Sequence, residues 1–326
     1  KTIEADFLKN LVNAQSHDYV LLFTNKGKVY SIKAYMIPEA GKQSKGKAAV
    51  NLINIAEDEK IINILSVPSF DENKSLLLCT SKGIVKKTKI SAYSRIKKSG
   101  IIAIRIREED VLISAEIIDM NNHVFLITKK GMSINFNETD VREVGRNSIG
   151  VKGIRLRADD KVVGMITAKE GEILSKSLLT VTEHGYGKRT QLLNYRKQRR
   201  GGIGIKDIKA DERNGDVLDA KKINAEDEIL LSSSSGKVIR MRADDVREIG
   251  RNTKGVKLMG IEENEKITSV DVIVAGKNQD ADTNIKQDAD TKRDAAHDTD
   301  DTTQNQNQSL QEKTQEIHEQ NLEQNL

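Results

Sequence analysis

The sequence predicts an all-β, propeller-like fold of six blades, the first of them truncated, followed by a disordered C-terminal tail. Two observations lead to this prediction. A self-similar unit recurs at intervals of 48 to 56 residues, and each copy is typical of short strands joined by glycine turns. The last 50 residues, in contrast, hold few apolar side chains and cannot bury enough surface to offset the loss of chain entropy.

The repeat unit opens with a short apolar run that ends in Thr or Ser, followed by two residues and a glycine. Five copies begin near residues 19, 75, 123, 177 and 228. A second glycine follows the first after 17 or 19 residues. The paired glycines are Gly27 and Gly46, Gly83 and Gly100, Gly131 and Gly150, Gly185 and Gly202, and Gly236 and Gly255. The segments 140–152 and 245–257 share ten of 13 residues, which chance does not produce.

Each repeat is interpreted as one four-stranded blade. The opening run has about five residues, too few for a helix, and its apolar side chains suit a strand buried on both faces. After the glycine, residues 132–137 and their equivalents alternate between apolar and polar, which predicts a strand with one polar face. A basic loop, a third strand, an acidic turn and a fourth strand complete the unit. No helix is needed in residues 1–276, and residues 1–18 resemble the end of a further, partial blade.

The charge distribution divides the chain after residue 276. The chain has 53 Lys and Arg against 49 Asp and Glu, a net charge of +4. Residues 277–326 carry a net charge of −7, so residues 1–276 carry +11. We therefore expect a β domain over 1–276 and a disordered, acidic and Gln/Asn-rich tail over 277–326. A basic body predicts a polyanionic partner, and the acidic tail is a candidate competitor for it.

Composition excludes other classes of protein. No apolar run approaches the roughly 20 residues that a transmembrane helix needs, so we expect no membrane partner. The single cysteine, Cys79, cannot build a disulfide framework or a thiolate metal cluster, and it fits a reducing cytoplasm. The chain begins at Lys1 without an apolar signal core, which indicates a fragment or excised domain of a cytoplasmic protein.

A basic loop lies between the two glycines of every repeat. Equivalent loops of repeated blades fall on one circle, so we expect a positive stripe around a rim, which fits the phosphates of a bent duplex. Few aromatic side chains are present to stack on single strands, which also favours duplex DNA. The alternative is that the loops are basic for solubility alone. The candidate DNA-binding residues of four loops are Lys42, Lys45 and Lys47; Arg95, Lys97 and Lys98; Arg142, Arg146 and Lys152; and Arg247, Arg251, Lys254 and Lys257.

The fourth loop adds candidates and resembles a known family. Its candidates are Arg196, Lys197, Gln198, Arg199, Arg200, Gly201, Gly202 and Gly204. The string Q-R-R-G-G-x-G at 198–204 resembles the diagnostic box of the C-terminal domain of DNA gyrase A. Residues 185–190, the two Gly-Arg-Asn-x-x-Gly-Val segments and parts of 30–39 are similar to that family too. The resemblance covers about residues 1–275 and implies a six-bladed β-pinwheel that wraps duplex DNA, presents a segment for strand passage and supports negative supercoiling.

The box departs from the family pattern in its position. The family carries it in the first repeat, whereas the intact string here lies in the fourth full repeat. The resemblance extends a DNA-contact role to Gln198 and to the Arg and Gly residues that follow it. The glycines permit a tight turn close to phosphate, and the arginines supply forked donors. A plain glycine-rich hairpin turn is the alternative interpretation.

No catalytic constellation is recognised in the sequence. His17, His123 and His184 lack metal-ligand spacing, and the pair Asp159-Asp160 is interpreted as a turn. Phosphate-binding loops and nucleophile motifs are absent from the sequence. We therefore expect no cofactor in this chain.

The resemblance places the chain in an ATP-dependent type IIA topoisomerase, an isomerase. ATP and Mg²⁺ are then needed only in the complete enzyme. The implied partners are duplex DNA, the N-terminal part of gyrase A, and gyrase B. The alternatives are the equivalent domain of topoisomerase IV and a propeller-like scaffold that binds acidic partners.

Overall fold

The computed structural model describes residues 12–41 and 46–275. Most of the predicted partial blade at 1–18 lies outside these residues, as do Lys42, Lys45 and the tail at 277–326. The described part consists of strands and short 3-10 helices. None of the helices in this part is long and apolar enough to cross a membrane.

The strands follow the repeats. The opening apolar runs form β1 (Tyr19–Thr24), β4 (Ser75–Thr80), β8 (Asn122–Thr128), β12 (Ser177–Thr182) and β16 (Glu228–Ser233). The segments after the glycine turns form β2 (Lys28–Lys33), β5 (Ile84–Lys89), β9 (Met132–Asn137), β13 (Tyr186–Gln191) and β17 (Val238–Arg242). The third strands have two residues each and are β6 (Ile101–Ile102), β10 (Val151–Lys152), β14 (Ile205–Lys206) and β18 (Val256–Lys257). The last strands are β3 (Ile61–Val67), β7 (Leu112–Ile118), β11 (Val162–Lys169), β15 (Val217–Ile223) and β19 (Ile267–Ile273).

The 3-10 helices are short and connect strands. They are η1 (Ala34–Met36), η2 (Ala49–Asn51), η3 (Ile90–Tyr93), η4 (Glu138–Asp140), η5 (Glu170–Glu172), η6 (Leu192–Asn194) and η7 (Ala243–Asp245). Five of them follow the second strand of a repeat, where the chain turns into the basic loop.

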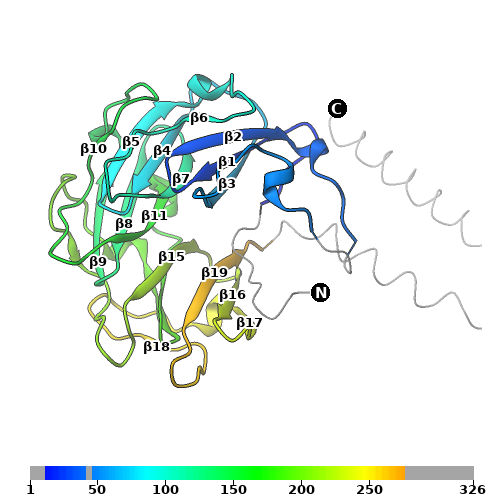
Figure 1. Ribbon diagram of the computed structural model, residues 1–326. Helices are drawn as coiled ribbons and strands as arrows, with labels where there is room; N and C mark the ends of the chain where they lie inside the picture. Colours follow the sequence, from blue (N-terminus) through cyan, green and yellow to red (C-terminus); the bar gives the residue numbers. More distant parts are fainter. Residues whose placement is uncertain (1–11, 42–45, 276–326) are drawn as a thin grey trace, which may run out of the picture. The chain divides into compact units, whose positions relative to one another are not determined.

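The strands form successive blades, four of them four-stranded and the last three-stranded (Figure 1). The first blade has the order β3-β1-β2-β6, and the last has the order β17-β16-β19. The last strand of each repeat is innermost, and β3, β7, β11, β15 and β19 contact one another in succession. The second strand of each repeat therefore lies toward the outer edge.

The third strand of a repeat joins the preceding blade, so the prediction that one repeat forms one blade is wrong at this position. β6 pairs with β2, and β10, β14 and β18 pair in the same way with β5, β9 and β13. The glycine turn of one blade receives the next repeat: the N–H groups of Ala103 and Ile104 donate to the carbonyl of Gly27. Gly27 has a φ of +77°, and a Cβ there would lie 2.6 Å from the Ile104 oxygen, so only glycine fits.

The described residues form five blades, which corrects the expected six. Residues 12–18 form no strand of a further blade. Instead, the carbonyls of Ser16 and Asp18 accept hydrogen bonds from Tyr35 and Ala34, at distances of 3.0 Å each. These bonds extend the β1–β2 hairpin, so the segment before β1 completes the first described blade.

The core consists of apolar clusters between neighbouring blades. Alternate residues of one opening strand face opposite neighbours: Leu76 and Leu78 pack with the first blade, and Leu77 and Cys79 pack with the third. All four side chains are fully buried. The predicted burial on both faces is thereby confirmed, and it explains why these strands are apolar at every position.

The second strands differ from the predicted pattern. In β9, the polar residues Ser133 and Asn135 are buried although the sequence alternates. The next repeat covers them, because Ser133 pairs with Ile205 of β14 and the Asn135 amide donates to the Tyr195 carbonyl at 2.8 Å. The polar face of this strand is an interface between repeats.

Candidate nucleic-acid interface

Four loops at the outer edges of the blades lead into the exchanged third strands. We call them rim loops; they comprise residues 90–100, 138–150, 192–204 and 243–255. Each begins with a 3-10 helix after the second strand of its own repeat and ends before a strand on the preceding blade. The last residues of the rim loops are glycines with positive φ, namely Gly100, Gly150, Gly204 and Gly255. In the fourth repeat this position belongs to Gly204, which corrects the assignment of Gly202 from spacing.

Three rim loops are attached to the preceding blade at both ends. Isolated parallel bridges join Lys87 to Glu143, Asn135 to Lys197 and Arg189 to Glu248. The exchanged strand then pairs with the same second strand. Because the attachment points repeat, equivalent residues of the three loops occupy equivalent places on successive blades.

The box at 198–204 packs closely against the preceding blade. The Gln198 N–H donates to the Asn135 carbonyl at 2.8 Å, and the Gly201 N–H donates to the Gly153 carbonyl at 2.6 Å. Gly204 has a φ of +76°, and a Cβ there would lie 2.3 Å from the Ser133 oxygen. The box is therefore a crossing between blades and not a hairpin turn.

Most of the predicted DNA-binding side chains are exposed. The exposed members within the described residues are Lys47, Arg95, Lys97, Lys98, Arg142, Lys152, Arg196, Lys197, Arg199, Arg247, Lys254 and Lys257. Arg146, Arg200 and Arg251 are half-buried, as are Gln198 and the glycines of the box. Lys254 pairs with Asp211 at 2.5 Å, and this contact lowers the pKa of the Asp211 carboxyl. The exposed set is thus in place for an outside ligand, with part of the Lys254 charge already compensated.

Further basic side chains next to the rim loops are missing from the sequence-based set. Arg105, Arg155 and Lys209 are exposed, and their backbone N–H groups donate to the rim loop of the next repeat. The acceptors are the carbonyls of Ser148, Gly202 and Thr253. The alternation of apolar and basic residues after each exchanged strand, as in Ile154-Arg155-Leu156-Arg157, is the signal that could have found them.

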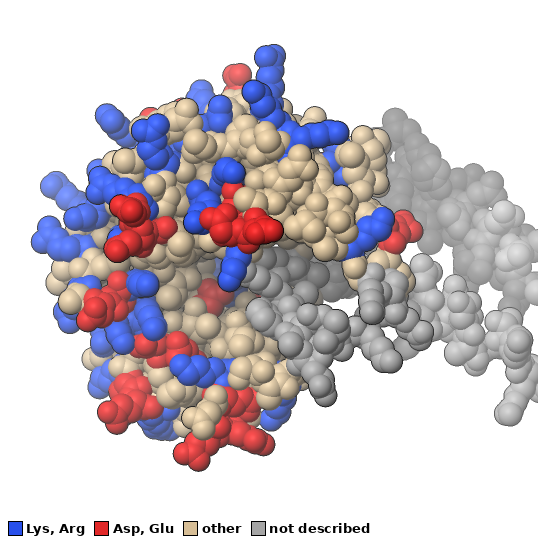
Figure 2. Space-filling view, in the orientation of Figure 1, with Lys and Arg blue, Asp and Glu red and all other residues tan. Residues whose placement is uncertain are grey.

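Charge is distributed unevenly over the visible face. Figure 2 shows Lys and Arg side chains projecting along the margin that carries β6, β10 and β9, whereas groups of Asp and Glu lie inside that margin. Some of these acids belong to turns: Asp160 accepts hydrogen bonds from the Thr128 hydroxyl at 2.7 Å and from the Lys130 N–H at 2.9 Å. Asp159-Asp160 therefore stabilises a hairpin turn, as its interpretation from the sequence predicts.

Two buried lysines support the rim loops from beneath. Lys86 Nζ donates to the carbonyls of Ala103 at 2.6 Å and Arg146 at 2.7 Å. Its burial lowers the pKa of the Lys86 ammonium to about 7. Lys188 Nζ donates to the carbonyls of Asp207 and Gly250 and pairs with the Asp207 carboxylate at 3.1 Å. Both side chains are fully buried and act within the fold.

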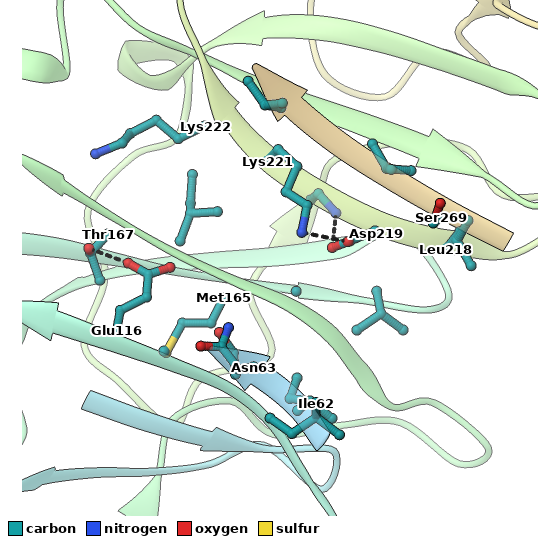
Figure 3. Close-up of a pocket in the computed structure, with 18 of the residues that line it drawn as sticks. Ile62, Asn63, Glu116, Met165, Thr167, Leu218, Asp219, Lys221, Lys222 and Ser269 are labelled. Carbon is teal, nitrogen blue, oxygen red and sulfur yellow. Dashed lines mark hydrogen bonds and ion pairs between the residues drawn. The ribbon is translucent and has the colours of Figure 1, made fainter. Parts of the chain in front are cut away.

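A cavity of about 390 Å³ lies where the five innermost strands meet. Figure 3 shows Glu116 with Thr167, and Lys221 with Asp219, on its wall. Burial raises the pKa of the Glu116 carboxyl to about 7, against the opposing effects of the Thr167 hydroxyl and Lys222. Lys222 pairs with Glu172 at 2.9 Å. The ionic groups of the wall are thus largely paired with one another.

The described residues contain no group of three or more side chains suited to a metal ion. His123 is buried, with Nδ1 3.1 Å from Asn135 Oδ1 and Nε2 2.7 Å from Glu170. Cys79 is buried in β4, and burial raises the pKa of its thiol. Both have the structural roles that the sequence indicates.

The repeats match a known family. A family model described as the DNA gyrase C-terminal domain, β-propeller, matches residues 18–68, 74–119, 122–169, 176–224 and 227–273. The chain is 40% identical to DNA gyrase A of Haloquadratum walsbyi over 272 residues, which cover 82% of this chain and 32% of the relative. It is 38% identical to DNA gyrase A of Staphylococcus aureus (strain NCTC 8325 / PS 47) over 270 residues, 82% of this chain and 30% of the relative. The chain thus spans about a third of the length of these relatives.

Two solved structures share the arrangement of blades. One is the C-terminal domain of DNA gyrase A, with a TM-score of 0.69 and 32% identity, covering 80% of this chain and 84% of that chain. The other is the C-terminal domain of DNA topoisomerase IV, with a TM-score of 0.73 and 27% identity, covering 80% of each chain.

Proposed function

Because the chain belongs to the family of DNA gyrase C-terminal domains, we propose that it binds duplex DNA along its rim loops and bends it. The observation that carries this proposal is the register of exposed basic side chains. Arg142, Arg196 and Arg247 occupy the same position in three rim loops and are all exposed. A ligand with regularly spaced negative charges can contact them in turn.

Bending and contact energies are of comparable size. Smoothly bending 20–30 base pairs of duplex by 40–90° costs on the order of 1–6 kcal/mol. Each neutralised phosphate releases condensed counterions, which favours binding at low salt. Contacts recruited from successive blades offset the cost of bending, because each blade offers its charges at an equivalent place.

The interface suits the DNA backbone better than the bases. The two tyrosines within the rim loops, Tyr93 and Tyr195, are 0% and 2% exposed. They cannot serve as platforms on which unpaired bases stack. The exposed side chains are Lys and Arg, whose contacts to phosphate carry no sequence information.

In the complete enzyme the chain would act beside other parts. We place the N-terminal part of gyrase A, together with gyrase B, as its partners, in the cytoplasm, with bent DNA presented for strand passage and negative supercoiling. We assign ATP and Mg²⁺ to the complete enzyme and no cofactor to this chain.

Energy transfer between the labelled ends of a short duplex, titrated with the full chain, tests the proposal. The rim variant changes Arg142, Arg196 and Arg247 to Gln. The matched control changes Lys26, Lys82 and Lys130 to Gln, which removes the same charge from three hairpin turns whose lysines pair with Asp58, Glu109 and Asp216.

We expect the chain to raise the transfer efficiency at low salt. The rim variant should lower the slope of log affinity against log salt by about 0.9 per residue that contacts a phosphate, and the control should not. Equal slopes for both variants would reject the rim loops as the interface. Binding without a rise in transfer would favour a role like that of topoisomerase IV without bending, and no binding would favour a scaffold for acidic partners.

A further inference from the structure

Three arginines form one repeated contact between neighbouring rim loops. Arg146 Nη1 donates to the Ile102 carbonyl at 3.2 Å. Arg200 Nη1 donates to the Lys152 carbonyl at 2.9 Å, and Arg251 Nη1 to the Lys206 carbonyl at 3.3 Å. Each donor lies five residues before its own exchanged strand, and each acceptor is the last residue of the exchanged strand one repeat earlier. The contacts therefore link repeats two to five in series.

A backbone hydrogen bond accompanies each arginine contact. The N–H groups of Arg105, Arg155 and Lys209 donate to the next rim loop, at 3.1, 2.8 and 2.8 Å. Each of these donors lies three residues after the carbonyl that accepts the guanidinium. Every junction thus combines a side-chain bond in one direction with a backbone bond in the other.

The junctions differ in what supports them from beneath. Lys86 and Lys188 bind carbonyls of the following rim loop at the first and third of these junctions. At the middle junction the equivalent residue is Ile134, which has no donor to offer. There Arg200 makes a second bond, from Nε to the Asp140 carbonyl at 2.7 Å, so one guanidinium holds both ends of the neighbouring rim loop.

We propose that Arg146, Arg200 and Arg251 are positioning residues that couple adjacent rim loops, while the exposed basic residues beside them contact phosphate. This inference rests on the proposed function. The three side chains are half-buried, whereas Arg142, Arg196 and Arg247 are exposed. A planar guanidinium can reach two carbonyls at fixed angles, which an ammonium does not reproduce. The coupling holds the phosphate-binding side chains at the spacing that a bent duplex needs.

The junction between the first two blades lacks this device. Its equivalent position is Ile96, which packs on the cluster between these blades. The series of arginine contacts therefore begins at the second repeat, and the middle junction depends most on its arginine.

Substitution at Arg200, with its exposed neighbour Arg199 as the matched control, tests the inference. Arg200→Lys keeps the charge and loses the paired bonds. We expect it to leave the salt slope of DNA binding unchanged and to reduce the energy transfer between duplex ends at saturation. Arg199→Lys should change neither quantity, and Arg199→Gln should lower the salt slope by about 0.9. If Arg200→Gln lowers the slope by this amount and Arg200→Lys restores both slope and transfer, Arg200 is a phosphate contact and the inference is overturned.

Hydrogen exchange separates this inference from the proposed function, because it needs no DNA. The amides of Arg155 and Gly201 lie at the middle junction. In Arg200→Lys they should exchange at least about tenfold faster than in the unchanged chain, and in Arg199→Lys they should not. Amides of β4 and β16 should keep their protection in both variants, which shows that the fold is intact. Unchanged exchange at Arg155 and Gly201 would overturn the coupling even if the chain bends DNA.

Discussion

Basic residues of the rim differ in role because they differ in burial. Lys86 is fully buried and its pKa is lowered to about 7, so it donates to carbonyls within the fold. Arg200 is half-buried and bonds to two carbonyls of the neighbouring loop. Arg142 is exposed and is available to a phosphate. Counting charges in a loop therefore overestimates the number of groups that can contact DNA.

The glycines of the box differ in the same way. Gly204→Ala places a Cβ 2.3 Å from the Ser133 oxygen at a φ of +76°, whereas a Cβ at Gly202 meets its nearest neighbour at 3.6 Å. We expect Gly204→Ala to lower the free energy of unfolding by about 1–3 kcal/mol, and Gly202→Ala by less than about 0.5 kcal/mol. Urea denaturation of both variants measures this. Equal losses would show that the positive-φ turn before β14 carries no special constraint.

The exchanged strand is the element that joins one repeat to the next. A two-residue strand contributes little pairing by itself, but it completes the outer edge of the preceding blade and carries the rim loop there. The last blade receives no such strand within the described residues, so β17 is an edge strand. Its residues are half-buried or exposed, while β13 of the preceding blade is mostly buried.

This difference predicts local stability. The β17 amides that face away from β16 should exchange at least about tenfold faster than the equivalent amides of β13, which face β18. Hydrogen exchange followed by NMR on the unchanged chain measures both sets. Equal protection would indicate that β17 is covered by a partner strand, which would contradict the three-stranded order.

At the scale of the whole molecule, the five blades meet around a cavity with ionisable walls. β3, β7, β11, β15 and β19 all contribute to its lining. Glu116 is the wall residue whose carboxyl pKa is raised to about 7 from an ordinary value of 4.5. The folded state therefore binds more protons than the unfolded state between these two pH values. The free energy of unfolding should fall as the pH rises from 4.5 to 7.

Replacement of Glu116 removes this dependence. Glu116→Gln keeps an acceptor for the Thr167 hydroxyl and cannot ionise, so we expect a melting temperature higher by about 2–4 °C at pH 8 and little change at pH 4.5. The exposed Glu57→Gln is the control and should show no such difference between the two pH values. A Glu116→Gln variant that is less stable at pH 8 would show that the ionised carboxylate is favourable in the cavity.

Local patterns were sufficient for the strands and for the location of the rim loops. Apolar runs such as 75–80 predict strands buried on both faces, and the structure places them between two clusters. The glycine spacing correctly separates the repeats, because positive-φ turns require that residue type. The DNA-contact role of each rim residue stays a prediction.

Tertiary structure alone decided the number of blades, the blade that each third strand joins, and the different roles of neighbouring arginines. A two-residue segment such as Val151-Lys152 carries no pattern that selects its own blade or the preceding one. That choice depends on the glycine turn and the outer strand of a repeat about 50 residues away, whose carbonyls are exposed to it only after folding. The same reason separates Arg199 from Arg200: they are adjacent in sequence, and only the position of the neighbouring loop determines which guanidinium meets carbonyl oxygens and which meets solvent.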